Sequence, residues 1–142
     1  MPDLKNFNRL LPDTQELLLE LIDGVKVIFF NAKWSFIKPE RVNQFNLATM
    51  ESIAAMKVNV LFLRAKYRDY YDLYFLSKKC MNIKKIFECG LSIMSGITFK
   101  LFATALIYVD DIEDDNIEFL EPIEKISKNE IRVFFQNELK KY

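Results

Sequence analysis

Between Lys57 and Leu76, several charged side chains stand in an otherwise apolar and aromatic segment, and their types suit the binding of phosphate. They are Lys57, Arg64, Lys66, Arg68, Asp69 and Asp72. If the segment is one helix, with about 100° between successive residues, Lys57, Arg64 and Arg68 share a face. A Lys ammonium offers phosphate a point charge and an Arg guanidinium offers a bidentate fork, so this face could bind a nucleotide or RNA. The alternative is a surface stripe of ion pairs between the Asp residues and their basic neighbours, and residue types alone favour it.

The composition excludes several other kinds of site. The chain has 142 residues and no His, so Ser-His or Cys-His catalysis cannot operate within it. Cys80 and Cys89 are too far apart for a Cys-x-x-Cys redox motif, and without His they cannot complete a common zinc site. We expect both to be reduced thiols in the core of a cytoplasmic protein. The acidic run VDDIEDDNIE lacks the glycine and the ligand spacing of a calcium loop, so we expect no metal ligands in this chain.

Two segments are relevant to whether the chain is secreted or spans a membrane. The amino terminus has no long apolar core followed by a cleavage site, so we expect no secretory signal. Between Cys89 and Val109 the one charged residue is Lys100, and the length approaches that of a spanning helix. Lys100 lies near the middle, where an ammonium is costly in lipid, and Gly, Ser and Thr dilute the apolar character. The pattern favours a buried helix, or two helices that meet near Gly96, and no membrane partner.

The charges are divided along the chain, although Lys and Arg together equal Asp and Glu at 20 each. From Lys57 to Lys85 there are eight basic and two acidic residues, and from Asp110 to Glu124 there are eight acidic residues and no basic one. A basic patch is typical of phosphate recognition. Helix faces exposed to water would show the same pattern, so the fold must bring the basic groups together for the first interpretation to apply.

The elements that would position these residues form a single α+β domain over residues 1–142. A β-hairpin and a connecting loop are expected over 1–48, with strands near 16–22 and 25–31 joined by Asp23-Gly24, a pair suited to a two-residue turn. A helical bundle is expected over 49–142, and the hairpin should pack on it. At this length a chain buries roughly two thirds of the surface of its unfolded form, so it needs neither disulfides nor metals for a core.

The first helix of the bundle should begin at Thr49, whose side chain can cap it. Its expected buried stripe consists of Ile53, Met56, Val60 and Leu61. A second helix is expected over 67–79, although one continuous helix through Ala65 stays open. Further helices are expected near 82–95, 98–109 and 128–140. The aromatic residues Tyr67, Tyr70, Tyr71, Tyr74 and Phe75 should lie mostly in the core, with stacking on nucleic-acid bases as the alternative.

The segment ATMESIAAMKVNVLFLRAKYRDYYDLYFL resembles the abortive-infection nucleotidyltransferases, the AbiEii/AbiGii toxin-like family. In that family a Lys-bearing helix leads into an Arg-x-Lys-x-(Arg/Lys)-Asp-x-x-Asp-Leu motif. Upstream, DGVKVIFFNAKWSFIKPE is similar to the family's strand and following turn, and FATALIYVDDIED is similar to its tail. The resemblance covers most of the chain. It implies a bacterial origin, nucleotidyltransferase ancestry, a hairpin that is a remnant of a nucleotidyltransferase sheet, and a place in a toxin–antitoxin or phage-defence system.

The resemblance also implies roles for matched residues. These are catalytic for Lys57, Asp69 and Asp72, and nucleotide- or phosphate-binding for Lys57, Arg64, Lys66 and Arg68. For the catalytic set and Arg64, the functional interpretation is preferred over a structural one. For Lys66 and Arg68 the two interpretations are about even.

Two departures from the family pattern concern activity. Members of the family carry a Gly-Gly-(Thr/Ser) turn and an Asp-x-Asp or Asp-Phe-Asp pair that holds magnesium, and this chain has neither motif. Ile28 stands at a strand position where many members carry a further Asp. Because metals offset the charge that develops in nucleotidyl transfer, their loss should remove most of the rate.

These departures favour a truncated or split toxin-family protein that retains some affinity for a nucleoside triphosphate or RNA but is not catalytic alone. One alternative is an active enzyme completed by another chain, which would then use Mg²⁺ and a nucleoside triphosphate; this chain alone is expected to hold no cofactor. The other is a non-catalytic regulator that binds RNA or protein. The expected partners are a cognate antitoxin, a missing N-terminal half, and a second copy of the chain, because a half-sheet would expose an apolar edge.

Overall fold

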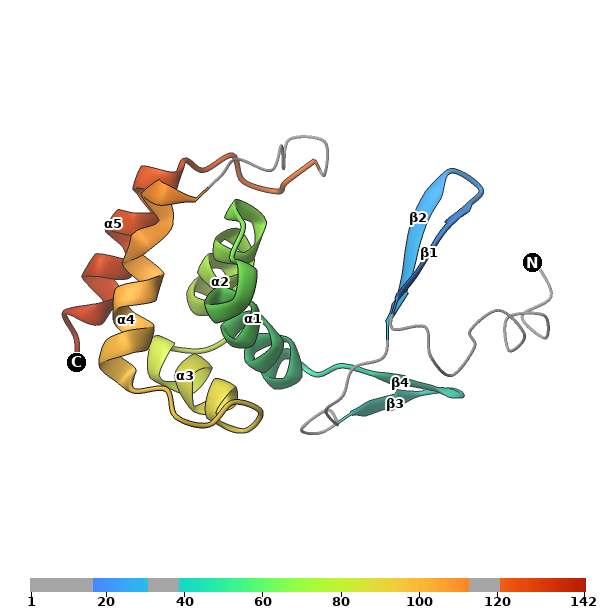
Figure 1. Ribbon diagram of the computed structural model, residues 1–142, viewed down its shortest axis with the longest axis horizontal. Coiled ribbons are helices and arrows are strands. Elements are labelled where there is room, and N and C mark those ends of the chain that lie inside the picture. Colours follow the sequence, from blue (N-terminus) through green and yellow to red (C-terminus); the bar gives the residue numbers. More distant parts are fainter. Residues whose placement is uncertain (1–16, 31–38, 113–120) are drawn as a thin grey trace. The chain divides into compact units, whose positions relative to one another are not determined.

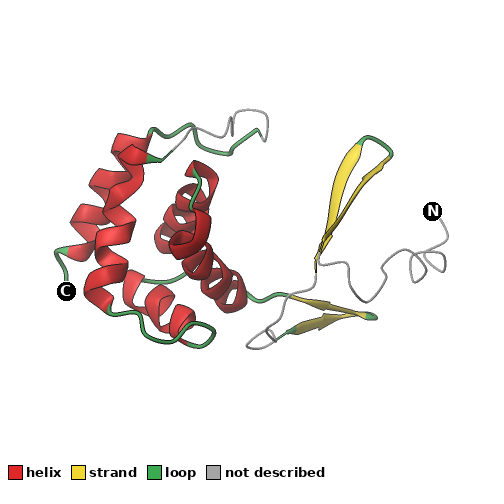
Figure 2. Ribbon diagram, viewed as in Figure 1, coloured by secondary structure: helices red, strands yellow, loops and turns green. Residues whose placement is uncertain are grey.

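The computed structural model describes residues 17–30, 39–112 and 121–142 (Figure 1). The chain divides into two compact units, residues 1–35 and 36–142, and each is described by itself. The described residues contain two antiparallel strand pairs and five α-helices, and helix predominates (Figure 2). The predicted class, α+β and mostly helical with a short N-terminal hairpin, is therefore confirmed. A single domain over 1–142 stays a prediction.

The first strand pair is the hairpin of β1 (Leu17–Ile22) and β2 (Val25–Phe30). Ile22 is opposite Val25, and the turn between them has positive φ at both residues, 51° at Asp23 and 79° at Gly24. Positive φ at both central positions is the requirement of a type I′ turn, which Asp-Gly meets at low cost. The hairpin predicted from the Asp23-Gly24 pair is therefore present, with ends within one residue of those expected.

The second strand pair, β3 (Glu40–Val42) and β4 (Phe45–Leu47), was not predicted. The sequence pattern indicates a connecting loop up to residue 48, and the structure has a short hairpin there instead. Its turn contains Asn43 at φ 56°, whose carbonyl accepts a hydrogen bond from Arg41 Nε at 3.3 Å. Strands of three residues are too short to show an alternating pattern. Both strands are exposed in this chain.

The polar motif lies on two helices, α1 (Met50–Arg64) and α2 (Tyr67–Lys79), rather than on one continuous helix. Thr49 caps α1, as predicted, by accepting a hydrogen bond from Ser52 N at 3.2 Å. The helix ends because Ala65 (φ −53°, ψ 131°) and Lys66 (φ −117°, ψ 164°) are extended. The chain then turns back on itself, and α2 begins with Lys66 as its N-cap.

Three further helices complete the bundle, α3 (Ile83–Leu91), α4 (Phe99–Ile107) and α5 (Lys128–Leu139). Asn82, Thr98 and Ser127 cap them through their side chains. A short 3-10 helix, η2 (Tyr108–Asp111), follows α4. The apolar stretch after Cys89 is therefore divided between two helices, with Gly96 between them at φ 85°, which is the second of the two predicted alternatives. Within the described residues, no helix is long and apolar enough to cross a membrane.

The core lies between these helices. α1 packs on α2 and α3, and α4 packs beside α5 (Figure 1). The fully buried side chains of the core include Val58, Leu73, Ile83, Ile86, Phe102, Leu106, Ile131 and Phe135. Cys89 is also buried, and burial raises the pKa of its thiol. Cys80 is exposed at the C-cap of α2, so its predicted place in the core was wrong.

The buried face of α1 also differs in part from the predicted stripe. Leu61 is buried as expected, but Ala54, Ala55 and Val58 provide the rest of the apolar core contact. The larger side chains predicted there, Ile53, Met56 and Val60, are only partly buried. Small side chains let a neighbouring helix approach closely, and hydrophobicity alone does not identify such a contact.

Helices α1 and α3 approach closely at Gly90. A Cβ atom added at Gly90 would lie 2.4 Å from Val58 Cγ1 and 2.9 Å from Val58 Cβ. Gly90→Ala should therefore lower the free energy of unfolding by about 1–3 kcal/mol in urea titrations, because overpacking outweighs the better helix propensity of Ala. In a Val58→Ala background, Gly90→Ala should lower the free energy of unfolding by less, because the 2.4 Å contact with Val58 Cγ1 is removed. A Gly90→Ala protein as stable as the parent would contradict this packing.

Candidate functional site

The break between α1 and α2 brings Lys57 against Asp69 and Asp72. Lys57 lies in the middle of α1, and both carboxylates lie in the first half of α2. The ammonium is 2.9 Å from Asp69 Oδ1 and 2.5 Å from Asp72 Oδ2. Asp69 Oδ2 also accepts a hydrogen bond from Lys66 N at 3.0 Å, so this carboxylate caps the start of α2 as well. We call Lys57, Asp69 and Asp72 the cation cluster.

The three members of the cation cluster differ in burial. The side chain of Asp69 is 8% exposed, that of Lys57 24%, and that of Asp72 45%. Burial is the largest influence on the pKa of Lys57 and lowers it, but the hydrogen bonds and charges of Asp72 and Asp69 together outweigh it, so the pKa is raised above its ordinary value. The ammonium therefore stays charged at neutral pH. Asp72 is the most exposed member of the cation cluster and so the most accessible to a ligand.

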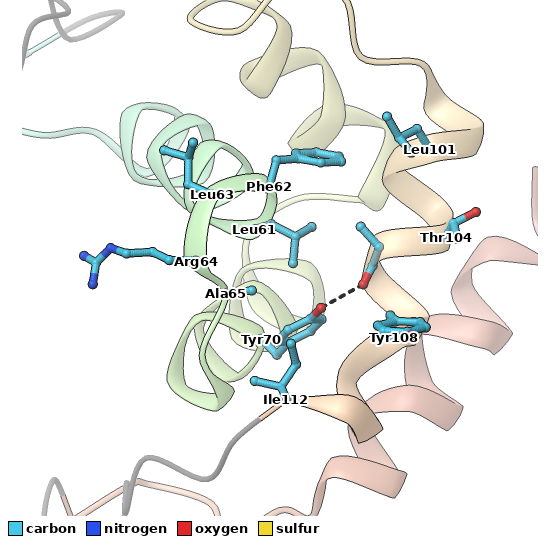
Figure 3. A pocket seen from close by; sticks show the side chains of 11 residues that line it. Leu61, Phe62, Leu63, Arg64, Ala65, Tyr70, Leu101, Thr104, Tyr108 and Ile112 are labelled. Carbon is cyan, nitrogen blue, oxygen red and sulfur yellow. Dashed lines mark hydrogen bonds between the residues drawn. The ribbon is translucent and has the colours of Figure 1, made fainter.

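The other predicted phosphate-binding residues lie at the end of α1 and the start of α2. Arg64, Lys66 and Arg68 are all exposed. Arg64 is the last residue of α1, and its side chain points away from the cavity drawn in Figure 3. The predicted alignment of Lys57, Arg64 and Arg68 assumed one helix. Lys57 and Arg64 both lie on α1 and share a face, but the chain leaves the helical path at Ala65, so the predicted alignment with Arg68 was wrong. Arg68 instead lies on α2, where it lines a cleft together with Asp72.

Two cavities lie against this part of the bundle. The first, of about 310 Å³, is lined mainly by apolar side chains from the end of α1, α4 and η2 (Figure 3). Tyr70 lines it and donates a hydrogen bond to the carbonyl of Ala105 at 2.8 Å. Burial, and then the charge of Asp69, raise the pKa of Tyr70 to about 12, so its hydroxyl stays protonated.

The second cavity, which we call the α2 cleft, has a volume of about 390 Å³ and shares Asp72 with the cation cluster. Its lining residues are Arg68, Tyr71, Asp72, Phe75, Glu121, Pro122 and Ile123. Tyr67, Tyr70 and Tyr74 are buried, as predicted for most of the aromatic residues of α2. Tyr71 and Phe75 are only partly buried and line this cleft. The contribution of residues 121–123 had no signal in the sequence, because these residues are distant from α2 along the chain.

A model of the family described as nucleotidyl transferase AbiEii toxin, type IV TA system, matches residues 20–138, which is well over half of the chain. The chain belongs to this family. The AbiEii resemblance of its Lys-bearing helix and Arg-x-Lys-x-Arg-Asp motif is thereby confirmed at the level of the family. The match includes all three members of the cation cluster.

One curated relative of this AbiEii-family chain is an uncharacterized protein of Aquifex aeolicus (strain VF5). The two are 28% identical over 138 residues, which cover 94% of this chain and 65% of the relative. The chain thus spans slightly less than two thirds of that protein. No solved structure matches the chain.

The burial of the two carboxylates leads to a prediction about stability. In double-mutant cycles built from Lys57→Met with Asp69→Asn or Asp72→Asn, the coupling to Asp69 should be about 1–3 kcal/mol, since that carboxylate is buried. The coupling to the half-exposed Asp72 should be below about 1 kcal/mol, because water screens it. Urea denaturation of the variants measures both values. Equal couplings, or a stronger one to Asp72, would contradict the assignment of Asp69 as the structural anchor.

Proposed function

We propose that this chain is the helical part of a nucleotidyltransferase-type toxin, and that it binds the phosphates of a nucleoside triphosphate at the cation cluster without transferring the nucleotide by itself. The supporting observation is the position of Lys57 between one buried and one half-exposed carboxylate. A Lys ammonium has three hydrogens to donate, and two of them serve Asp69 and Asp72. The third can be donated to a phosphate oxygen, and Asp72 can release the ammonium when a ligand arrives.

The net charge of the cation cluster determines which ligands can bind to it. One ammonium and two carboxylates carry a formal charge of −1, which disfavours a bare phosphate. Arg68, on the same helix as Asp72, supplies a further positive charge at the α2 cleft. Mg²⁺ bound to the triphosphate would reduce its negative charge and could itself contact Asp72. We therefore propose that binding is stronger with Mg²⁺ than without it.

Catalysis should require residues that this chain does not carry. The sequence has no Gly-Gly pair and no Asp-x-Asp pair, and family members use these to hold the triphosphate and magnesium. Among the described residues, no group of three His, Cys, Asp or Glu side chains could hold a metal ion. Metal ions in nucleotidyl transfer bridge phosphate oxygens and stabilise developing charge. We propose that a separate segment or chain supplies them, which leaves open a complete enzyme assembled from two parts.

Protein partners are part of the same proposal. The family description names a toxin of a type IV toxin–antitoxin system, and we propose that an antitoxin binds this chain. Homodimerisation, expected from the sequence, stays a prediction. The exposed side chains of Val42, Phe45 and Leu47 on the β3–β4 hairpin would provide apolar area for such contacts.

A non-catalytic RNA-binding regulator is the second candidate function. The observation that favours it is the exposure of Arg64 and Lys66 at the corner between α1 and α2, where they could contact an RNA backbone. Binding of this kind would persist without Mg²⁺ and would weaken steeply with salt, because it rests on the release of counterions. Those two properties distinguish it from binding of a magnesium-bound triphosphate.

Calorimetric titration with each nucleoside triphosphate and Mg²⁺ tests the main proposal. We expect saturable binding by the parent chain and a loss of at least about tenfold in affinity for Lys57→Met, since one charged hydrogen bond is removed. Lys79→Ala, an exposed change at the far end of α2, is the matched control and should bind normally. No nucleotidyl transfer should occur with this chain alone. Absence of binding to every triphosphate would exclude the proposal.

A further inference from the structure

The α2 cleft has two walls, and its dimensions suit a small ligand. One wall is a face of α2, on which Arg68, Tyr71, Asp72 and Phe75 recur at the three- and four-residue spacing of one helix side. The other wall consists of residues 121–123. The volume of about 390 Å³ falls within the range of roughly 300–1,000 Å³ that is usual for ligand pockets. The cleft therefore can hold a molecule the size of a nucleobase and its sugar.

The wall of the cleft that α2 forms is partly aromatic. The rings of Tyr71 and Phe75 have centroids 5.0 Å apart and an interplanar angle of 37°, and both side chains are partly exposed. Pro122 and Ile123 line the opposite wall, and Ile123 is 89% exposed, so the cleft is open to solvent on that side. A slot with aromatic rings on one side and aliphatic groups on the other favours a flat, apolar ring as its occupant.

The second wall is held in place by side chains of α2. The Tyr71 hydroxyl donates to the carbonyl of Glu124 at 2.9 Å and accepts from Glu124 N at 3.2 Å. The Glu124 carboxylate accepts from Lys78 Nζ at 2.8 Å and from the Tyr74 hydroxyl at 3.3 Å. The hydrogen bond from Lys78 lowers the pKa of Glu124, and the reverse effect raises the pKa of Lys78 to about 12, so both stay charged at neutral pH. These contacts fix the wall beside the cleft, which is therefore formed before a ligand arrives.

Arg68 is the positively charged residue that lines the cleft, and Lys57 lies beside the cleft through its contact with Asp72. Arg68 lies two turns of helix before Phe75, about 10 Å along the axis at 1.5 Å per residue. Lys57 contacts Asp72, which lines the cleft between them. A cationic end and an aromatic end separated by this length match the separation between the phosphates and the base of a nucleotide.

We propose that the α2 cleft binds the base of a nucleotide, stacked on Tyr71 and Phe75, with its phosphates directed toward Arg68 and Lys57. This inference rests on the proposed function of the cation cluster and adds the subsite for the base. The base belongs either to a free nucleoside triphosphate or to the end of a single-stranded RNA, because both present the same ring. Stacking on an aromatic platform tolerates every base, so discrimination among the four bases should be weak.

The test compares ligands with and without a base. We would titrate the full chain in Mg²⁺ with inorganic tripolyphosphate, with each nucleoside triphosphate and with a trinucleotide RNA. Nucleoside triphosphates should bind about 5- to 100-fold more tightly than tripolyphosphate, which is the usual effect of one stacked base. Phe75→Leu should remove most of that difference while leaving tripolyphosphate affinity unchanged. Leu63→Ala, an exposed change on the other cavity, is the control and should alter neither affinity.

The possible outcomes distinguish failure of the base subsite from failure of phosphate binding. The base subsite is overturned if tripolyphosphate and the nucleoside triphosphates bind with equal affinity. It is also overturned if Phe75→Leu keeps the parental affinity for nucleotides. Neither result contradicts phosphate binding at the cation cluster. Binding of RNA but not of triphosphates, if lost in Phe75→Leu, supports the subsite and identifies the RNA as the source of the base. Failure of every ligand to bind overturns both. Circular dichroism and the thermal midpoint of Phe75→Leu must match the parent, and Phe75→Met repeats the test if they do not.

Discussion

The structure around the candidate site depends on one ammonium group held by two carboxylates across a helix break. Lys57 can meet Asp69 and Asp72 only because α1 ends at Arg64 and the extended residues Ala65 and Lys66 turn the chain back. Asp69 makes two contacts. Its Oδ1 accepts a hydrogen bond from the Lys57 ammonium, and its Oδ2 accepts one from Lys66 N and so caps α2. Loss of Asp69 would therefore disturb folding and the site together. A ligand could contact the half-exposed Asp72 without disturbing the fold in this way.

Helix α2 connects this arrangement to the rest of the bundle. One side contributes Tyr70 and Leu73 to the core, and another presents Asp69 and Asp72 to Lys57. A further side holds residues 121–126 through hydroxyl groups, with Tyr67 donating to the carbonyl of Ile126 and Tyr71 to that of Glu124. Tyrosine suits this position because its ring packs against apolar neighbours while its hydroxyl satisfies a backbone group. The same helix thus fixes the cluster, the cleft and the wall opposite it.

Local signals in the sequence were sufficient to predict most elements of the fold. Thr49 and Asp23-Gly24 locate a helix start and a turn through their own backbone preferences, and α2 begins and ends where the pattern places it. The α1–α3 contact was not predictable in the same way, since it depends on the missing side chain of Gly90, which lets Val58 approach the α3 backbone. The β3–β4 hairpin is too short to have a periodic pattern.

The candidate site was predictable only in part. The resemblance to the AbiEii family selects Lys57, Asp69 and Asp72, and the structure brings these three together. Helical periodicity alone placed Arg68 on the same face as Lys57 and missed the break at Ala65, after which Arg68 lies on a different helix. The α2 cleft could not be predicted, because Glu121 and Glu124 reach α2 from about 50 residues further along the chain and no local pattern marks that contact.

The most direct test of the central claim is to observe the Lys57 ammonium while a ligand binds. In protein labelled with ¹³C-lysine, the Cε signal of Lys57, assigned by its loss in Lys57→Met, would be followed during titration with Mg²⁺ and a nucleoside triphosphate. If Lys57 binds phosphate, its signal should shift saturably, whereas that of Lys79 should not move. A Lys57 signal that stays unchanged at saturating ligand would contradict the proposed site and leave the cluster with a structural role alone.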